Sequence, residues 1–154
     1  MPPDGPDVLA SVLEACPTCE VVAELSIQER SAEEWQEYFT EEAALTGRSE
    51  AEVLTLISYL AINFPSTGVR DLATLPRGGR YLVMMNCQLC HSIAIPLTQT
   101  RSLERWLEHR RTSPHDSLSL NAVQWDTIAH YLTYNTPLPL EAIPEELRMG
   151  AGGY

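Results

Sequence analysis

The sequence predicts an all-α protein built as two helical domains in tandem. Polar start signals precede apolar residues at helical spacing along the chain, and no segment requires a strand to explain its pattern. The second half also repeats the pattern of the first half. The length of 154 residues allows one ordinary domain or two small ones, and an apolar content of 44% supports a hydrophobic core.

The repeat begins at two cysteine pairs with the same spacing, Cys16 with Cys19 and Cys87 with Cys90. The residues that match without a gap are Gln28, Arg30, Ser31, Glu33 and Trp35 in the first half and Gln99, Arg101, Ser102, Glu104 and Trp106 in the second. After one inserted residue, the matches continue with Tyr59, Leu60, Asn63 and Pro65 against Tyr131, Leu132, Asn135 and Pro137. This many matches in register predict a tandem duplication.

Helices are expected at corresponding places in the two halves. In the first half, residues 7–15 lead into the cysteine pair, and two start signals, Ser31 with Glu34 and Ser49 with Glu52, open further helices. In the second half, the expected helices run from Gly79 into Cys87, over 102–110 and over 121–134.

The repeat and the turn-forming residues also predict the domain boundaries. We expect a first domain at residues 1–65, a linker at 66–77, a second domain at 78–137 and an extended tail at 138–154. Gly68 and Pro76 favour turns in the linker, and prolines and glycines interrupt the tail.

The net charge of the chain limits the kinds of molecule that it is expected to bind. A net charge of −11 disfavours nucleic acid and anionic membranes, and it favours a protein with a basic docking face. No run approaches the roughly 18 apolar residues that a membrane-spanning helix needs. The N-terminal residues also lack the basic start and apolar stretch of a secretory signal peptide.

The segment Cys87-Gln88-Leu89-Cys90-His91 carries the strongest chemical signal. C-x-x-C-H is the attachment signature of c-type haem, in which two thiols bind the vinyl groups of one porphyrin and the histidine binds its iron. A chance C-x-x-C beside an unrelated histidine, or half of a zinc site, is the alternative. The sequence therefore predicts one covalently bound haem c, with Cys87, Cys90 and His91 as its binding residues.

The first half differs at the position that matters most for iron. Glu20 stands where the second half has His91, so we expect the first half to bind no haem. For Cys16 and Cys19 a local disulfide is favoured over two buried thiols, and a thiol-redox role is the third alternative.

With these residues identified, the second half resembles the class I cytochrome c family over residues 78–137. The resemblance rests on Gly79 and Tyr81 before the motif, on the C-x-x-C-H itself and on the end of the last helix at 128–132. The segment 102–106 is similar to that of haem subunits of periplasmic dehydrogenases. The first half resembles the same fold without its iron-binding histidine.

The resemblance implies a fold in which the first and last helices cross at right angles through a glycine–aromatic contact. It also implies haem c, one-electron transfer and a periplasmic location, with an exported chain whose signal peptide has been removed. We expect no enzymatic activity of the chain itself. It would serve as an electron carrier or as the electron-transfer subunit of a redox enzyme, with a redox protein or a catalytic subunit as its partner.

The chain departs from the family at the sixth iron ligand, which is usually a methionine before the last helix. Met84 and Met85 precede the motif on its own helix, and Met149 could reach the iron only if the tail folded back. His115, in the loop where the ligand is expected, is the first candidate, and His109 is the second.

Asp116 is a candidate acceptor for the His115 ring. A ligand from a partner chain, or an open sixth site, is the remaining alternative. An open or weakly ligated site would make the chain a haem-based sensor that binds CO or NO.

Overall fold

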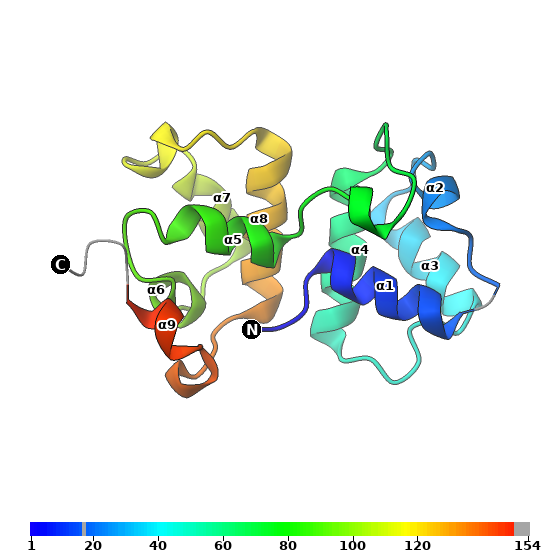
Figure 1. The fold of residues 1–154 in the computed structure, drawn as a ribbon, viewed down its shortest axis with the longest axis horizontal. Helices are drawn as coiled ribbons and strands as arrows, with labels where there is room; N and C mark the ends of the chain where they lie inside the picture. The colour runs from blue at the N-terminus through cyan, green and yellow to red at the C-terminus, as the bar shows by residue number, and fades with distance from the viewer. Residues whose placement is uncertain (17, 150–154) are drawn as a thin grey trace. The chain divides into compact units, whose positions relative to one another are not determined.

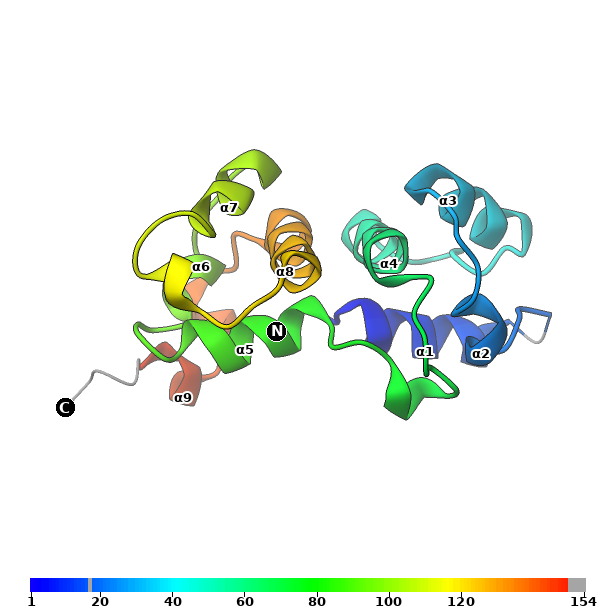
Figure 2. The same cartoon turned by 90° about the horizontal axis from the view of Figure 1, so that it is seen from above.

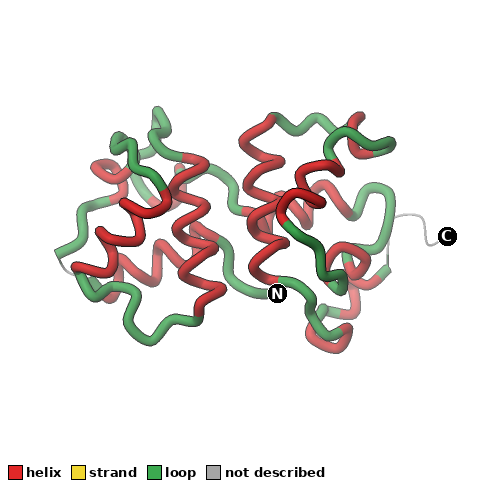
Figure 3. Tube along the Cα trace, turned by 180° about the vertical axis from the view of Figure 1, so that it is seen from behind, coloured by secondary structure: helices red, strands yellow, loops and turns green. Residues whose placement is uncertain are grey.

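The computed structural model describes residues 1–16 and 18–149, and these residues contain helices but no strand, which confirms the all-α class (Figure 3). The chain divides into two compact units. One is Pro3–Gly78, and the other combines Met1–Pro2 with the chain from Gly79 onward. Among the described residues, no helix has both the length and the hydrophobicity needed to cross a membrane.

The first unit contains α1 (Gly5–Ala15), α2 (Val22–Leu25), α3 (Ala32–Glu41), α4 (Glu50–Asn63) and the 3-10 turn η1 (Leu72–Thr74). Both α1 and α3 pack against α4 (Figures 1 and 2). The predicted start signals cap their helices. The Ser31 hydroxyl accepts a hydrogen bond from the Glu34 N–H, and the Glu34 carboxylate accepts one from the Ser31 N–H at 2.7 Å.

Residues 66–77, which the sequence predicts as a linker, pack onto the first unit instead. Val69 and Leu75 are buried in its hydrophobic core. The Tyr59 hydroxyl donates to the carbonyl of Pro76 at 2.8 Å. The apolar side chains in this turn-rich segment therefore attach it to the helices that precede it.

The second unit contains α5 (Gly79–Cys87), α6 (Ala94–Leu97), α7 (Leu103–His109), the 3-10 turn η2 (His115–Ser117), α8 (Ala122–Asn135), the 3-10 turn η3 (Leu140–Ala142) and α9 (Glu145–Arg148). Helices α5, α6 and α7 all pack against α8. Where the sequence predicts both ends of a helix, as for α1, α5, α7 and α8, the structure agrees within two residues at each end. Helices α3 and α4 begin one residue after their predicted start signals. The short helices α2, α6 and α9 were not predicted.

Residues 138–149 do not form the extended tail that the sequence predicts. Ile143 is completely buried in the core of the second unit, and Leu147 packs against the same core. The Leu138 N–H donates to the carbonyl of Leu97 at 2.7 Å. The rest of the predicted tail, 150–154, lies outside the described residues.

A glycine lets the first and last long helices approach closely in each unit. In the second unit, a Cβ atom on Gly79 of α5 would lie 2.2 Å from the Cβ of Tyr131 on α8. In the first unit, a Cβ on Gly5 of α1 would lie 2.1 Å from the Tyr59 ring on α4. Figure 1 shows α5 running across α8 and α1 running across α4. Tyr81, the aromatic residue that the sequence associates with this contact, is exposed.

The close contact at Gly79 predicts that replacing this glycine with alanine lowers the free energy of unfolding. In an open helix, Gly→Ala stabilises by about 1 kcal/mol. At Gly79 we expect the opposite, a loss of about 1–3 kcal/mol, because the new methyl group has no room beside Tyr131. Chemical denaturation followed by circular dichroism measures the change, and a Gly79→Ala variant as stable as the parent would contradict the contact.

Candidate functional site

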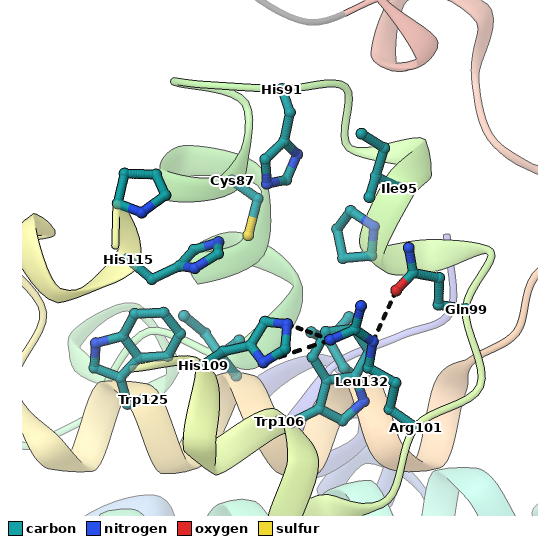
Figure 4. A pocket seen from close by; sticks show the side chains of 13 residues that line it. Cys87, His91, Ile95, Gln99, Arg101, Trp106, His109, His115, Trp125 and Leu132 are labelled. Atoms are coloured by element: carbon teal, nitrogen blue, oxygen red, sulfur yellow. Dashed lines mark hydrogen bonds between the residues drawn. The ribbon is translucent and has the colours of Figure 1, made fainter. Parts of the chain in front are cut away.

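The second unit contains an open cavity beside the C-x-x-C-H motif. Its free volume is about 770 Å³ with the open mouth included. Its walls come from α5, α6, α7, α8 and the loop before α8. The residues that line it are Cys87, His91, Ile95, Pro96, Gln99, Arg101, Trp106, His109, Pro114, His115, Trp125, Ile128 and Leu132 (Figure 4). Most of this wall is apolar, as in sites for flat hydrophobic cofactors.

The two motif cysteines differ in their surroundings. Cys87 ends α5 and lines the cavity, whereas Cys90 is exposed in the turn that follows. Burial raises the pKa of the Cys87 thiol to about 11, so it is protonated at neutral pH and is a weak nucleophile on its own. Both cysteines are free thiols.

His91 presents one ring nitrogen to the cavity. Its Nδ1 lies 2.9 Å from the carbonyl oxygen of Ser92. Because a carbonyl only accepts hydrogen bonds, Nδ1 carries the proton and Nε2 keeps its lone pair for a metal.

His115 faces His91 across the cavity. Their ring centres are 6.3 Å apart, and Figure 4 shows both rings directed into the same space. Metal–imidazole bonds are about 2 Å long, so two imidazoles bound to one metal from opposite sides have ring centres about 6 Å apart. The separation of His91 and His115 therefore fits a single metal centre between them.

The surroundings of His115 favour its neutral form. Its pKa is lowered, mainly by burial and then by electrostatic interactions with the nearby His91 ring and the Arg101 guanidinium. Its Nδ1 lies 3.4 Å from the Thr112 hydroxyl. The Thr112 hydroxyl, which was not predicted, is thus the side-chain group at hydrogen-bonding distance from Nδ1, while the charge of the predicted Asp116 acts on the ring by raising its pKa.

His109, the second candidate for the sixth ligand, uses both ring nitrogens. Its Nδ1 donates to the carbonyl of Arg105 at 3.0 Å, and its Nε2 accepts a hydrogen bond from the Arg101 guanidinium. Burial, followed by the charge of Arg101, lowers the pKa of His109. With its lone pair engaged by Arg101, His109 is less suited to bind a metal than His115.

Arg101 and Trp106 place two hydrogen-bond donors at the cavity wall. The Arg101 Nε donates to the side-chain oxygen of Gln99 at 2.7 Å, and the guanidinium lies over the Trp106 ring at 5.0 Å. The buried Nε1–H of Trp106 finds no acceptor among the described residues. A buried donor of this kind usually has an acceptor. The apolar wall and the two facing imidazoles fit haem, which is a flat apolar group with a central iron.

The other iron-ligand candidates lie away from the cavity. The Met149 side chain is 74% exposed and does not line the cavity. Met84 and Met85 lie on α5, the helix that ends at Cys87 of the motif, and neither lines the cavity. The fourth histidine of the chain, His130 on α8, also lies outside the cavity wall, where it bonds the carbonyl of Asp126 and packs beside the Tyr134 ring.

The first unit has buried aromatic rings in its core, and it has the Glu20 carboxylate at the position that matches His91. Trp35 and Phe39 are completely buried and stack with ring centres 6.1 Å apart. The Glu20 carboxylate accepts a hydrogen bond from the Gln28 amide. Cys16 and Cys19 form a disulfide, in agreement with the favoured alternative.

The arginine–tryptophan pair occurs in both units. Arg30 lies over the Trp35 ring at 4.6 Å, and the indole N–H of Trp35 also lacks an acceptor among the described residues. What distinguishes the second unit is therefore its motif, its cavity and its facing histidines. Comparison of the chain with protein-family models, curated proteins and solved structures found no match.

Proposed function

We propose that the chain is a monohaem c-type cytochrome that transfers single electrons and binds its haem in the second unit. The observation that carries this proposal is the C-x-x-C-H motif at an apolar cavity in which His91 and His115 face each other at 6.3 Å. The chain would act as a carrier or as the electron-transfer subunit of a redox enzyme. Its location would be periplasmic, because covalent attachment of haem c normally follows export.

In this proposal each part of the site has a defined task. When bound, the haem supplies the one-electron change between ferric and ferrous iron. Cys87 and Cys90 hold it covalently, while His91 and His115 bind the iron. Two imidazole ligands give a lower reduction potential than an imidazole with a methionine thioether. With haem in the cavity, the apolar wall would limit the access of water and lower the local dielectric constant.

The proposal includes a tandem duplication of a class I cytochrome c fold. Its support is the same order of long helices in each unit, with a glycine of the first helix against a tyrosine of the last. In the first unit, Glu20 replaces the iron-binding histidine and buried aromatic rings fill the interior. Haem would therefore bind only to the second unit.

The proposal is tested by expressing the chain in a bacterial periplasm that attaches haem c. We expect one haem per chain, bound covalently, with a low-spin spectrum that CO does not change. The near-infrared band of a methionine–iron bond should be missing, since two histidines would bind the iron. Protein that contains zinc and no iron would contradict the proposal and support the zinc alternative.

A second candidate function is a sensor that binds CO or NO at the iron. The observation that favours it is the position of His115 in the three-residue turn η2, with a ring contact to Thr112 as long as 3.4 Å. A weakly held sixth ligand would yield to a small gas molecule. A high-spin spectrum that shifts when CO is added would move this function ahead of electron transfer.

The charge of the chain is unevenly divided and indicates where a basic partner would dock. The first unit, residues 3–78, has 14 acidic residues and 4 arginines, a net charge of −10. The rest of the chain has 7 acidic residues and 6 arginines, a net charge of −1. In the proposed function, the first unit therefore supplies most of the electrostatic attraction for the partner.

This uneven charge predicts different effects of charge reversal in the two units. Glu33→Lys with Glu37→Lys, on the exposed face of α3, should slow electron transfer with a strongly basic redox protein about tenfold at low ionic strength. Stopped-flow kinetics at several salt concentrations measures the effect, which should fade as salt rises. The matched control is Glu141→Lys with Glu145→Lys in the second unit, and equal effects of the two pairs would contradict a docking role for the first unit.

A further inference from the structure

The residue after the motif, Ser92, contacts both the proposed iron ligand and the C-terminal segment. Its carbonyl oxygen accepts the hydrogen bond from Nδ1 of His91 at 2.9 Å. Its hydroxyl donates to the carbonyl oxygen of Arg148 at the end of α9. The same hydroxyl accepts a hydrogen bond from the Ala94 N–H at 3.1 Å, where α6 begins.

The C-terminal segment, residues 138–149, holds the chain at two places after the motif. At its start, the Leu138 N–H bonds the carbonyl of Leu97, which ends α6. At its end, Arg148 bonds Ser92 through its carbonyl, while its guanidinium Nε donates to the carbonyl of Ile143 at 2.8 Å. Ile143 is completely buried and anchors the segment in the core. Residues 92–97 are therefore fixed at both ends by the same segment.

We infer that the C-terminal segment, acting through Ser92, positions His91 for iron binding. This inference rests on the proposed haem function. A hydrogen bond from Nδ1 to a carbonyl fixes the tautomer of a ligating imidazole and raises its basicity. The bond to His91 holds only while the Ser92 carbonyl keeps its place, and the contacts of the Ser92 hydroxyl keep it there. Ser92 is a positioning residue, because its side chain does not reach the cavity.

Four single variants of the full chain test the inference. Ser92→Ala removes the hydroxyl, and Ser92→Thr retains one. Ile143→Val loosens the segment from the core without changing Ser92 or the cavity wall. Thr98→Val is the matched control, because the Thr98 hydroxyl, just after α6, bonds the carbonyl of Ala94 in that helix and does not contact the C-terminal segment through this bond.

In the haem-loaded protein we expect Ser92→Ala and Ile143→Val to raise the reduction potential. A less basic His91 stabilises ferric iron less well. Amide hydrogen exchange in residues 143–148 should become about tenfold faster in both variants, because the segment opens more readily. Ser92→Thr and Thr98→Val should leave the potential and the exchange rates unchanged.

A second measurement needs no haem and separates this inference from the proposed function. In the haem-free chain, ¹⁵N NMR of the His91 ring should show the Nδ1–H tautomer, and Ser92→Ala should shift it towards the Nε2–H tautomer. A parent chain that never acquires haem would refute the proposed function, and the tautomer would still test the role of Ser92. Faster exchange with an unchanged potential and tautomer would overturn the inference, because the segment would then only stabilise the fold.

Discussion

Replacing Cys87 and Cys90 together with serine is expected to abolish covalent attachment of haem completely. Serine cannot form the two thioether bonds, although the cavity and its histidines would remain. The variant would then release any bound haem into acidified acetone, whereas haem in the parent would stay with the denatured chain. Mass spectrometry of the whole chain gives the same answer, since the parent would carry the mass of one haem.

The chain contains a matched control for this experiment in its first cysteine pair. Cys16→Ser with Cys19→Ser removes the same number of thiols at the same spacing, but it breaks a disulfide in the first unit. We expect this control to keep one covalent haem. It should lose some thermal stability, because the unfolded chain gains freedom without the cross-link. Loss of covalent haem in this pair, with retention in the Cys87 and Cys90 pair, would contradict the assignment of the site.

The single variants Cys87→Ser and Cys90→Ser should not be equivalent. Cys87 already lines the cavity, whereas Cys90 is exposed in a turn. Of the two thiols, only Cys87 lies in the cavity wall where the haem would bind. We expect the chain that keeps Cys87 to attach haem more completely than the chain that keeps Cys90. Haem content per chain measures the difference.

The parts of the fold that depend on local chemistry could be predicted from the sequence. The start signals at Ser31 and Ser49 act within one turn, and both cap a helix in the structure. The predicted linker and extended tail failed for a common reason. Their turn-forming residues indicated their local conformation, but Leu75 and Ile143 are buried by helices distant in the sequence. A few apolar residues in a proline-rich segment are too weak a pattern to predict such contacts.

In the candidate site, too, the sequence predicts the residues that belong to a local motif but not the contacts between distant segments. Cys87 and His91 follow from the motif, and His115 follows from its loop before the last helix. The position of His115 opposite His91 depends on how the helices pack. The sequence therefore identifies His115 as a candidate but cannot predict its distance from His91. The contact of Ser92 with Arg148 was missed because it depends on tertiary packing. The contact of Thr112 with His115, three residues later, depends on the conformation of the loop between them. Arg101 and Arg30 match in the repeat, as do Trp106 and Trp35, and this match was a signal that each arginine packs on the tryptophan of its own half.

His115→Ala is expected to open the sixth coordination site of the haem iron. Removing the imidazole that faces His91 leaves one protein ligand on the iron, so the spectrum should change from low-spin to high-spin. CO should then bind to the ferrous protein at micromolar concentration, where the parent would not respond. Added imidazole should restore the low-spin spectrum, because it would occupy the space that the His115 ring leaves.

The two histidines of the distal side provide the control for this prediction. His109 lies 5.4 Å from His115 between ring centres, but its nitrogens are engaged by Arg101 and the Arg105 carbonyl. His109→Ala should therefore remain low-spin and fail to bind CO. If His109→Ala becomes high-spin while His115→Ala does not, His109 is the sixth ligand and its bond with Arg101 must break when haem binds. If the parent itself binds CO as readily as His115→Ala does, the sixth site is open and the gas-sensing function replaces electron transfer.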